Sequence, residues 1–238
     1  MMRIRFSFAR KMPLAYISHL DMLRLFLRAL SRSGLPLAYS QGYNPHPRFT
    51  LALPLPLGIT AGEEYGEVFF ADKIMPDQFI NVLQPQLPEA LVLTGSADVD
   101  PEEPSLASLV SAASYCCTLK SSSSVTVKLE LLQVALDRLM AKEEILALRK
   151  TKKNKTTYTN VRPYIIEVSV KNADQSKLLE FSLLLQAGSQ GGVSPGYVIG
   201  QLEPEPGAGN LHAYDWQIHR ERLYFKQNGS MQPLSERR

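Results

Sequence analysis

Cysteine is scarce in this sequence, and its scarcity excludes several kinds of site. Only two of the 238 residues are cysteines, and they are adjacent, at Cys116 and Cys117. Two neighbouring thiols cannot build a disulfide framework, and they do not have the spacing of zinc ligands. Because the pair lies within an apolar run, we expect buried structural thiols and not reactive ones.

Long apolar runs and the common catalytic motifs are also missing. No apolar run reaches about 18 residues, and the N-terminus lacks the uninterrupted apolar segment of a signal peptide. GxSxG, HExxH and CxxC are absent, and the glycine-rich stretch 188–192 lacks the Lys-Ser/Thr of a phosphate-binding loop. We expect a soluble, cytoplasmic protein that holds no metal and does not enter a membrane.

Charge of either sign is moderate overall, but it is unevenly distributed along the chain. The formal net charge is +3. Residues 1–48 carry eight Lys and Arg against one acid, whereas residues 49–105 carry one Lys against ten acids. This distribution predicts a basic pole suited to phosphates or another acidic surface. We expect the acidic segment to face elsewhere.

The strongest local signals lie in residues 16–58. Ser18 predicts the N-cap of a helix, with Asp21 as a short version of the capping box, and Gly34 and Pro36 predict the end of that helix. The leucines of the helix recur every three or four residues, which predicts one stripe buried in the core. They are Leu20, Leu23, Leu27 and Leu30.

A neighbouring arc of the same helix carries arginines. Arg24, Arg28 and Arg32 follow one another at intervals of four residues, and Asp21 is the only acid near them. Guanidinium groups stacked in this way repel one another unless an anion lies across them. The pattern therefore favours an anion-binding face over a merely solvated one.

Two histidines in this stretch are candidates for acid–base chemistry. His19 is either a general acid or base or simply the first residue after the helix cap. His46 lies between Pro45 and Pro47, and we expect it to face a cleft or a backbone carbonyl. Both are candidate catalytic residues, and neither is firmly assigned.

The remaining candidates are polar, aromatic or basic residues that could hold a substrate. Tyr43 is either a platform for a base or a half-buried ring. The run 149–155 has five cations in seven residues, and it is either a charged hairpin tip or a basic arm for a nucleic-acid backbone. The full set of candidate binding residues is Asp21, Arg24, Arg28, Arg32, Ser40, Tyr43, Asn44, His46, Arg48, Lys150, Lys152, Lys153 and Arg162.

The predicted elements follow the order β-α-β-β-α-β twice, which is typical of ferredoxin-like folds. The first set is expected at 2–9, 18–34, 49–57, 64–71, 76–87 and 91–95, with a short extra strand at 37–39. The second set has strands at 111–120, 145–150, 164–171, 178–186 and 216–225, and helices at 125–142 and after Ser194. That is one strand too many for the pattern. We predict an α+β protein with two ferredoxin-like halves packed side by side.

Proline and acidic residues mark the predicted boundary between the halves. The segment Asp98–Ser105 is acidic and is broken twice by proline, which favours a linker. We therefore expect an N-terminal domain at 1–98, a linker at 99–110 and a C-terminal domain at 111–226. The polar residues 227–238 are expected to form a flexible tail.

Two short motifs carry a resemblance to a known family. They are Ser18-His19-Leu20-Asp21 and Gly42-Tyr43-Asn44-Pro45-His46-Pro47, and a weaker likeness resumes at 151–153 and 161–163. The chain resembles the radical-SAM-associated (radical-SAM-linked) bacterial protein family of unassigned function, found beside or fused to B12-binding radical SAM proteins. Tyr43 stands where that family has a phenylalanine, and Asn160 where it has an acid.

This resemblance implies a radical SAM protein as partner, carrying an iron–sulfur cluster, S-adenosylmethionine and B12. Such a cluster needs three cysteine thiolates, so the adjacent pair in this chain cannot hold it, and we expect no cofactor here. The family's association with ribosome-related genes favours RNA or a ribosomal component as the substrate.

The layout also resembles the CRISPR repeat-processing endoribonucleases, which bind RNA across paired ferredoxin-like halves. A shared layout alone does not define function. Our leading hypothesis is an accessory protein that binds RNA or another anionic substrate for a radical SAM partner. The alternatives are a metal-independent, endoribonuclease-like enzyme that uses His19 and His46, or a protein-interaction module.

Overall fold

The computed structural model describes residues 1–120, 128–150, 156–171, 179–202 and 212–237. It is an α+β structure, as predicted, and it divides into two compact units. Unit 1 consists of residues 1–111 and 220–238, and unit 2 of residues 112–219. Unit 1 is therefore built from both ends of the chain.

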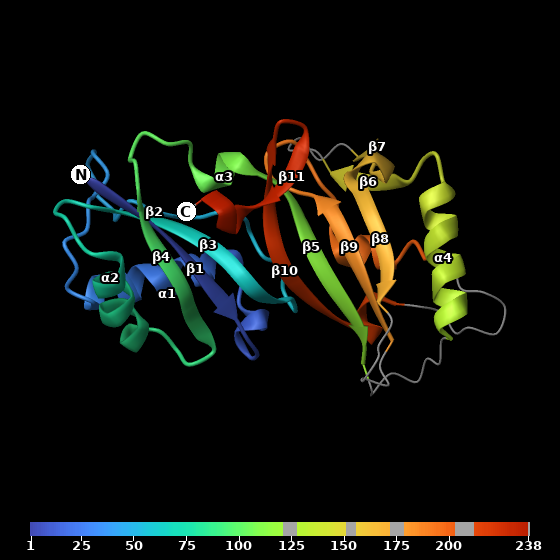
Figure 1. The fold of residues 1–238 in the computed structure, drawn as a ribbon, viewed down its shortest axis with the longest axis horizontal. Helices are drawn as coiled ribbons and strands as arrows, with labels where there is room; N and C mark the ends of the chain where they lie inside the picture. Colours follow the sequence, from blue (N-terminus) through green and yellow to red (C-terminus); the bar gives the residue numbers. More distant parts are fainter. Residues whose placement is uncertain (121–127, 151–155, 172–178, 203–211, 238) are drawn as a thin grey trace. The chain divides into compact units, whose positions relative to one another are not determined.

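Unit 1 is an antiparallel sheet covered by helices. Its strands lie in the order β4-β1-β3, and the short β2 also pairs with β3. Helices α1 and α2 lie together on one side of these strands (Figure 1). The elements are β1 (Met2–Arg10), α1 (His19–Arg32), β2 (Phe49–Leu51), β3 (Thr60–Phe70), α2 (Pro76–Leu83) and β4 (Leu91–Val99). Shorter elements of this unit are η1 (Leu14–Tyr16), η2 (Gln84–Gln86), α3 (Leu106–Leu109), β11 (Ser230–Pro233) and η5 (Leu234–Arg237).

Phenylalanine rings form the centre of the unit 1 core. Alternate residues of β1, among them Phe6 and Phe8, face the helices and are buried. The Phe6 ring lies 5.5 Å from that of Phe26 on α1 and 5.3 Å from that of Phe79 on α2, measured between centroids. Burial of these large side chains contributes hydrophobic stabilisation that holds both helices on the sheet.

Helix α1 begins and ends where the sequence predicts, but the predicted buried stripe is wrong in part. The residues that α1 buries are Met22, Phe26, Ala29 and Leu30. Leu20 is 62% exposed, and Leu23 and Leu27 are only half-buried. Apolar residues cover more than half of this helix, so the periodicity alone allows two arcs. The aromatic core of the sheet selects the arc that contains Phe26.

Strand β2 is shorter than predicted, because prolines interrupt the segment that follows it. The prediction extended from 49 to 57, whereas the observed strand ends at Leu51. Pro54 and Pro56 have no N–H to donate to a strand ladder. Their carbonyl oxygens accept hydrogen bonds from Arg220 and Arg10 instead. The predicted strand at 37–39 is reduced to isolated bridges at Leu37 and Tyr39.

The opposite face of β1 carries buried arginines, and these hold the proline-rich segment after β4. Arg3 donates to the carbonyl oxygen of Glu103 (2.6 Å), and Arg5 donates to that of Pro104 (2.8 Å). The segment that suggested a linker is therefore tied to the sheet. Residues 227–238, for which the sequence predicts a flexible tail, instead include β11 and the buried Leu234.

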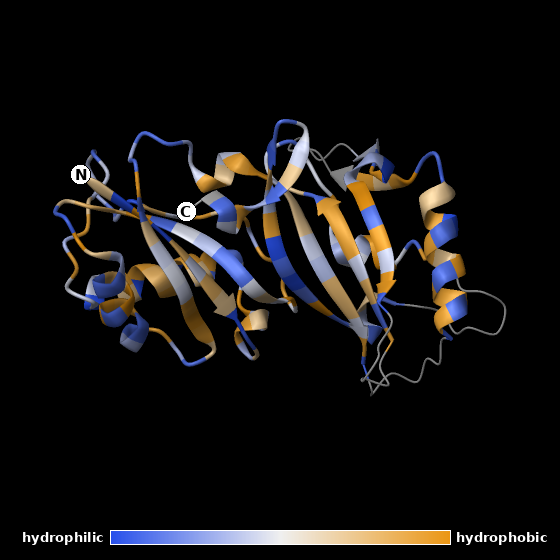
Figure 2. Cartoon of the chain, viewed as in Figure 1, coloured by the Kyte–Doolittle hydropathy of each residue, from blue (hydrophilic) through white to orange (hydrophobic). Residues whose placement is uncertain are grey.

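Unit 2 is also a sheet with helices, and its strands β5, β9 and β8 are neighbours in that order, all antiparallel. Apolar and polar residues alternate along α4 and β8 (Figure 2). The elements are β5 (Val110–Leu119), α4 (Leu129–Ala141), β6 (Leu146–Lys150), β7 (Thr156–Asn160), η3 (Arg162–Tyr164), β8 (Ile165–Lys171), β9 (Glu180–Gln186), α5 (Pro195–Ile199) and η4 (Ala213–Asp215). Strand β10 (Trp216–Gln227) begins in unit 2, and its residues from Arg220 onward belong to unit 1.

The extra strand that the sequence predicts in the second half lies in a sheet of its own. Strand β6 pairs only with β7, a strand that was not predicted, in a separate two-stranded ribbon. Helix α4 lies within the predicted range 125–142, and it buries Leu132, Leu136 and Leu139. Cys117 is buried and Cys116 is partly buried. None of the helices in the described ranges is long and apolar enough to cross a membrane.

Candidate functional site

The start of α1 is fixed by its first few side chains. Ser18 has the extended backbone of an N-cap, and its Oγ accepts a hydrogen bond from the backbone N–H of Asp21 (3.2 Å). The Ser18 hydroxyl also donates to the Asp21 carboxylate (2.7 Å). This hydrogen bond, followed by that from Arg24, lowers the pKa of Asp21. The cap predicted from the sequence is confirmed.

The three arginines of α1 are engaged to different degrees. Arg24 forms an exposed ion pair with Asp21 (3.1 Å), and Arg32 donates to the carbonyl oxygen of Gln86 (2.7 Å). Arg28 is exposed and has no hydrogen-bond or ion-pair partner among the described residues. One acid therefore faces three guanidinium groups.

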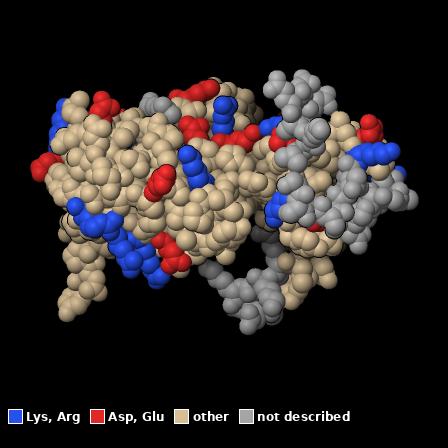
Figure 3. Space-filling model, turned by 90° about the horizontal axis from the view of Figure 1, so that it is seen from below, with Lys and Arg blue, Asp and Glu red and all other residues tan. Residues whose placement is uncertain are grey.

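A surface hollow of about 410 Å³ brings the three arginines together. Arg24, Arg28 and Arg32 line it, and Asp21 is the only acid among the described residues that do so. A second hollow of about 360 Å³ is also lined by Arg28 and Arg32, and it reaches Pro47. Pro47 belongs to residues 40–48, which we call the proline loop. Figure 3 shows Lys and Arg side chains gathered over unit 1 near one end of the face that it draws. The helix and the loop thus contribute to neighbouring parts of one surface.

The proline loop is held by its own hydrogen bonds. The backbone N–H of His46 donates to Ser40 Oγ (3.1 Å), and Ser40 Oγ lies 3.0 Å from His46 Nδ1. The backbone N–H of Ser40 donates to the carbonyl oxygen of His46 (2.9 Å). Asn44 is exposed, with its carbonyl oxygen 3.5 Å from His46 Nδ1, and Tyr43 is 99% exposed. The loop is a closed turn that presents an aromatic ring to solvent.

Arg48 is the last residue of the loop, but its side chain contacts Phe69 of β3 and Met1. Its guanidinium carbon is 4.0 Å from the centroid of the Phe69 ring, which is a cation–π contact. Its Nη1 is 2.8 Å from the sulfur of Met1. Arg48 does not line either of the two hollows along α1.

The two candidate catalytic histidines occupy different places. His19 is the first residue of α1 and lines a small cavity with Arg10 and Glu64. His46 adjoins Pro47, which lies beside Arg28 and Arg32 in the last turns of the same helix. A rise of about 1.5 Å per residue separates positions 19 and 28 by roughly 14 Å along the helix axis. His46 does not line the cavity that His19 lines.

The basic candidates after residue 148 belong to unit 2. Lys152 and Lys153 lie outside the described residues, and only the backbone of Lys150 is described, in β6. Arg162 binds main-chain carbonyl groups. Its Nη2 donates to the carbonyl oxygen of Met140 (2.8 Å) and its Nη1 to that of Ile165 (3.0 Å). Arg162 thereby satisfies a carbonyl group in the last turn of α4.

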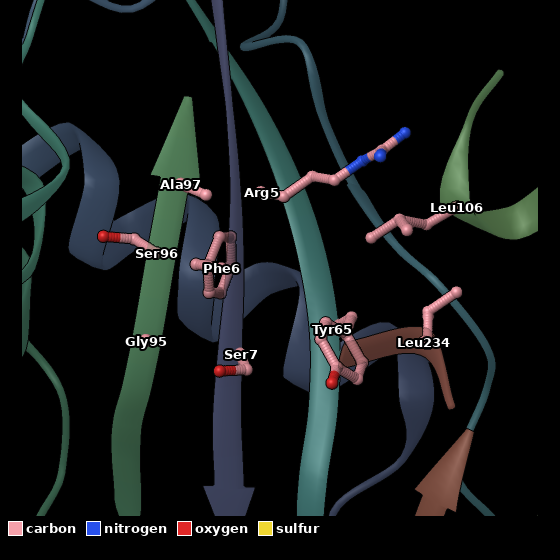
Figure 4. A pocket seen from close by; sticks show the side chains of 9 residues that line it. All are labelled: Arg5, Phe6, Ser7, Tyr65, Gly95, Ser96, Ala97, Leu106 and Leu234. Carbon is pink, nitrogen blue, oxygen red and sulfur yellow. The ribbon is translucent and has the colours of Figure 1, made fainter. Parts of the chain in front are cut away.

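Two buried charge networks in unit 1 were not predicted from the sequence, and the expectation that the acidic segment faces elsewhere is wrong. In the first network Glu67 pairs with Arg3 and Arg5, and Glu103 also pairs with Arg5 (2.9 Å). A cavity of about 10 Å³ adjoins this network, where Arg5 extends toward Leu106 (Figure 4). The alternation of arginines on β1 was a signal for a sheet face, but it does not distinguish a solvated face from a covered one.

The second network joins Arg220 of β10 to Glu64 of β3. Arg220 Nε donates to Glu64 Oε1 (2.6 Å), and its Nη2 binds the other carboxylate oxygen. Both side chains are buried. Because 156 positions separate the two residues, no local pattern in the sequence could predict this pair.

The fold and the site define an α+β protein with a hollow that three arginines line. Within the described residues, no group of three or more His, Cys, Asp or Glu side chains could hold a metal ion. The chain belongs to the bacterial family described as "Uncharacterized protein conserved in bacteria (DUF2344)", whose model matches residues 3–195. The match includes α1 and the proline loop. A comparison with curated proteins finds no match.

Proposed function

We propose that this protein is an accessory subunit that binds RNA, or a similar anionic substrate, along α1 and presents it to a radical SAM partner. The observation that carries the proposal is the hollow lined by Arg24, Arg28 and Arg32, in which Asp21 is the only acid among the described residues. A phosphate backbone is a polyanion that can contact successive guanidinium groups along one helix.

The charge balance of the hollow supports an anion as ligand. Arg24 is neutralised in part by Asp21, and Arg32 is oriented by Gln86. Arg28 lies between them in the sequence, exposed and without a partner among the described residues. A planar guanidinium with free donors can bind a phosphate through two hydrogen bonds. An incoming phosphate would also reduce the repulsion among the three cations.

Exposed aromatic residues in the same segment of the chain favour a nucleic acid over a simple anion. Tyr43 is almost fully exposed, and Tyr16 and Tyr39 are 67% and 50% exposed. All three belong to the segment that includes α1 and the loop. Tyrosine rings offer stacking platforms for unpaired bases, and a loop closed by its own hydrogen bonds loses little entropy on binding.

A ferredoxin-like fold in each unit is part of the proposal. In unit 1 the strand order β4-β1-β3-β2, with α1 and α2 on one face, supports it. In unit 2 the neighbours β5, β9 and β8, with α4 before β8 and α5 after β9, support it, and the β6–β7 ribbon would be an insertion. Proteins with this fold have many different functions, so the proposed RNA binding rests on the surface along α1 and not on the fold.

The radical SAM partner is proposed from the likeness of the Ser18–Asp21 and Gly42–Pro47 motifs alone. The partner would supply the iron–sulfur cluster, S-adenosylmethionine and B12, since two adjacent cysteines cannot hold a cluster. Expression of both proteins together tests this part. Co-purification that survives nuclease treatment supports a direct complex, and separation of the two proteins contradicts it.

The RNA-binding part is tested by measuring the affinity for labelled single-stranded RNA as a function of salt. The double variant Arg24→Ala/Arg28→Ala should bind more weakly, and the slope of log K against log salt should fall by about 1.4, roughly 0.7 for each lost phosphate contact. Arg222→Ala is the matched control, because Arg222 is exposed on β10 and does not line either hollow along α1.

Equal binding by wild type, the double variant and the control would refute the proposal. Cleavage of the RNA without added metal, lost in His46→Ala, would instead identify a ribonuclease.

A further inference from the structure

A small cavity lies under the first turn of α1, apart from the arginine hollow. It is lined on its polar side by Arg10 of β1, His19 of α1 and Glu64 of β3, and on its apolar side by Phe8 and Met22. Its volume is about 10 Å³. That is room for one water-sized atom and no more.

Arg10 contributes a buried donor that lacks an acceptor. The side chain is 2% exposed. Its Nη2 donates to the carbonyl oxygens of Ile59 (2.7 Å) and Pro56 (3.1 Å). Its Nε is buried and has no hydrogen-bond partner in the structure. An unmade hydrogen bond of a charged group is costly, so a partner for this N–H is expected.

The charge around the cavity is positive. Arg220 binds both carboxylate oxygens of Glu64. Glu64 also attracts Arg10, but the two form no ion pair within the described residues. Burial lowers the pKa of Arg10 to about 10, so the group still carries its proton at neutral pH. Two buried guanidinium groups are thus opposed by one buried carboxylate.

His19 completes the polar wall. Its ring nitrogens have no hydrogen-bond partner among the described residues. Burial, and then the positive charge of Arg220, lowers the pKa of His19, so the ring is neutral at pH 7 and offers one N–H donor. The cap formed by Ser18 and Asp21 holds this residue at the helix start.

We infer that this cavity binds one anionic oxygen atom of a small ligand, either a phosphate or a carboxylate oxygen. Arg10 Nε and a ring N–H of His19 would donate to it. The bound oxygen satisfies the donor that is otherwise without a partner and offsets the excess positive charge. The rest of the ligand would extend outward past His19, because His19 is the partly exposed member of the polar wall. This site does not depend on the proposed RNA surface.

Titration of the histidine ring protons by NMR tests the inference on the full chain, with inorganic phosphate, acetate and chloride as probes. A bound anion stabilises the imidazolium, so phosphate or acetate should raise the pKa of His19 in a saturable manner. His46 is the internal control, because it is exposed and bonded to Ser40. Comparing the rise in the pKa of His19 that phosphate produces with the rise that acetate produces identifies the chemical class of the ligand.

His19→Gln and Arg10→Lys are the variants that locate the site, with binding followed by the rise in melting temperature that the anion produces. Each should lower the affinity about tenfold or more, as expected for a lost hydrogen bond to a charged group. Arg222→Ala, at an exposed position that does not line this cavity, should leave it unchanged. If Arg10→Lys fails to fold, His19→Gln decides. Equal responses of His19 and His46, chloride as effective as phosphate and acetate, or no saturable shift would overturn the inference.

Discussion

At the scale of single residues, His19 has an unusual environment for the first residue of a helix. Most helix starts face solvent, whereas this ring lines a cavity beside a buried guanidinium. The pKa of His19 is lowered by burial first and by Arg220 second. The protonated ring is therefore disfavoured in the folded state relative to the unfolded chain.

This shift predicts how stability depends on pH. The unfolded state, with an ordinary pKa of about 6.5, binds the proton more readily than the folded state. The free energy of unfolding should therefore fall as the pH drops through about 6.5 toward the lowered pKa of the folded state, and it should become constant for this group below that pKa. Urea unfolding at a series of pH values, from about 8 to about 5, measures it.

Two variants provide the controls for this prediction. His19→Gln should flatten the dependence on pH in this window, because the titrating ring is gone. His46→Gln should leave the dependence as it is in the wild type. An unchanged slope in His19→Gln would show that another group is responsible.

At the scale of the elements, the packing of β1 against β3 requires a glycine. Gly66 lies opposite Phe6 in the register of the two strands. A Cβ at position 66 would be 2.5 Å from the Phe6 ring. The ring is enclosed by Phe26 and Phe79, so it cannot move aside. The close approach of backbone and ring explains why only glycine fits this position of the strand.

Gly66→Ala should therefore destabilise unit 1 by about 1–3 kcal/mol, which is the usual cost of overpacking a core. Chemical denaturation measures the free energy of unfolding. Phe6→Leu leaves room for the added methyl group, so Gly66→Ala should cost less in that background. The double-mutant cycle gives the coupling directly. Additive effects of the two changes would contradict the proposed contact.

At the scale of the whole molecule, unit 1 needs both ends of the chain. Arg220, near the start of β10, neutralises Glu64 and also donates to the carbonyl oxygens of Leu53 and Pro54. These bonds fasten the C-terminal part of the chain to β3 and to the segment after β2. All chain from 112 to 219 forms unit 2, so unit 1 can be completed only after unit 2 has been synthesised.

Arg220→Leu should consequently cost about 3–5 kcal/mol, because it leaves Glu64 buried without its partner. Thermal unfolding followed by circular dichroism checks the loss. Arg222→Ala, an exposed position on the same strand, should change stability by no more than about 0.5 kcal/mol. Adding Glu64→Leu to Arg220→Leu should restore much of the loss. If Arg220→Leu were as stable as Arg222→Ala, the pair would have no structural role.

Features whose causes lie within a few residues of one another can be derived from the amino-acid sequence alone. The cap at Ser18, the end of α1, the alternation of β1 and the burial of Leu132, Leu136 and Leu139 on α4 all follow from local chemistry and periodicity. Such signals need no knowledge of what the segment packs against.

Which faces are covered and which charges meet depends on how distant segments of the chain pack together. The arc that α1 buries follows from the phenylalanines of the sheet, and the pairing of Glu64 with Arg220 joins positions that are far apart in the chain. The arginines of the first 32 residues fall into a buried and an exposed group for the same reason. Arg3, Arg5 and Arg10 are buried and hold carboxylates and carbonyl groups, while Arg24 and Arg28 stay in solvent. A charge pattern is local, whereas the removal of a charge from water depends on the whole fold.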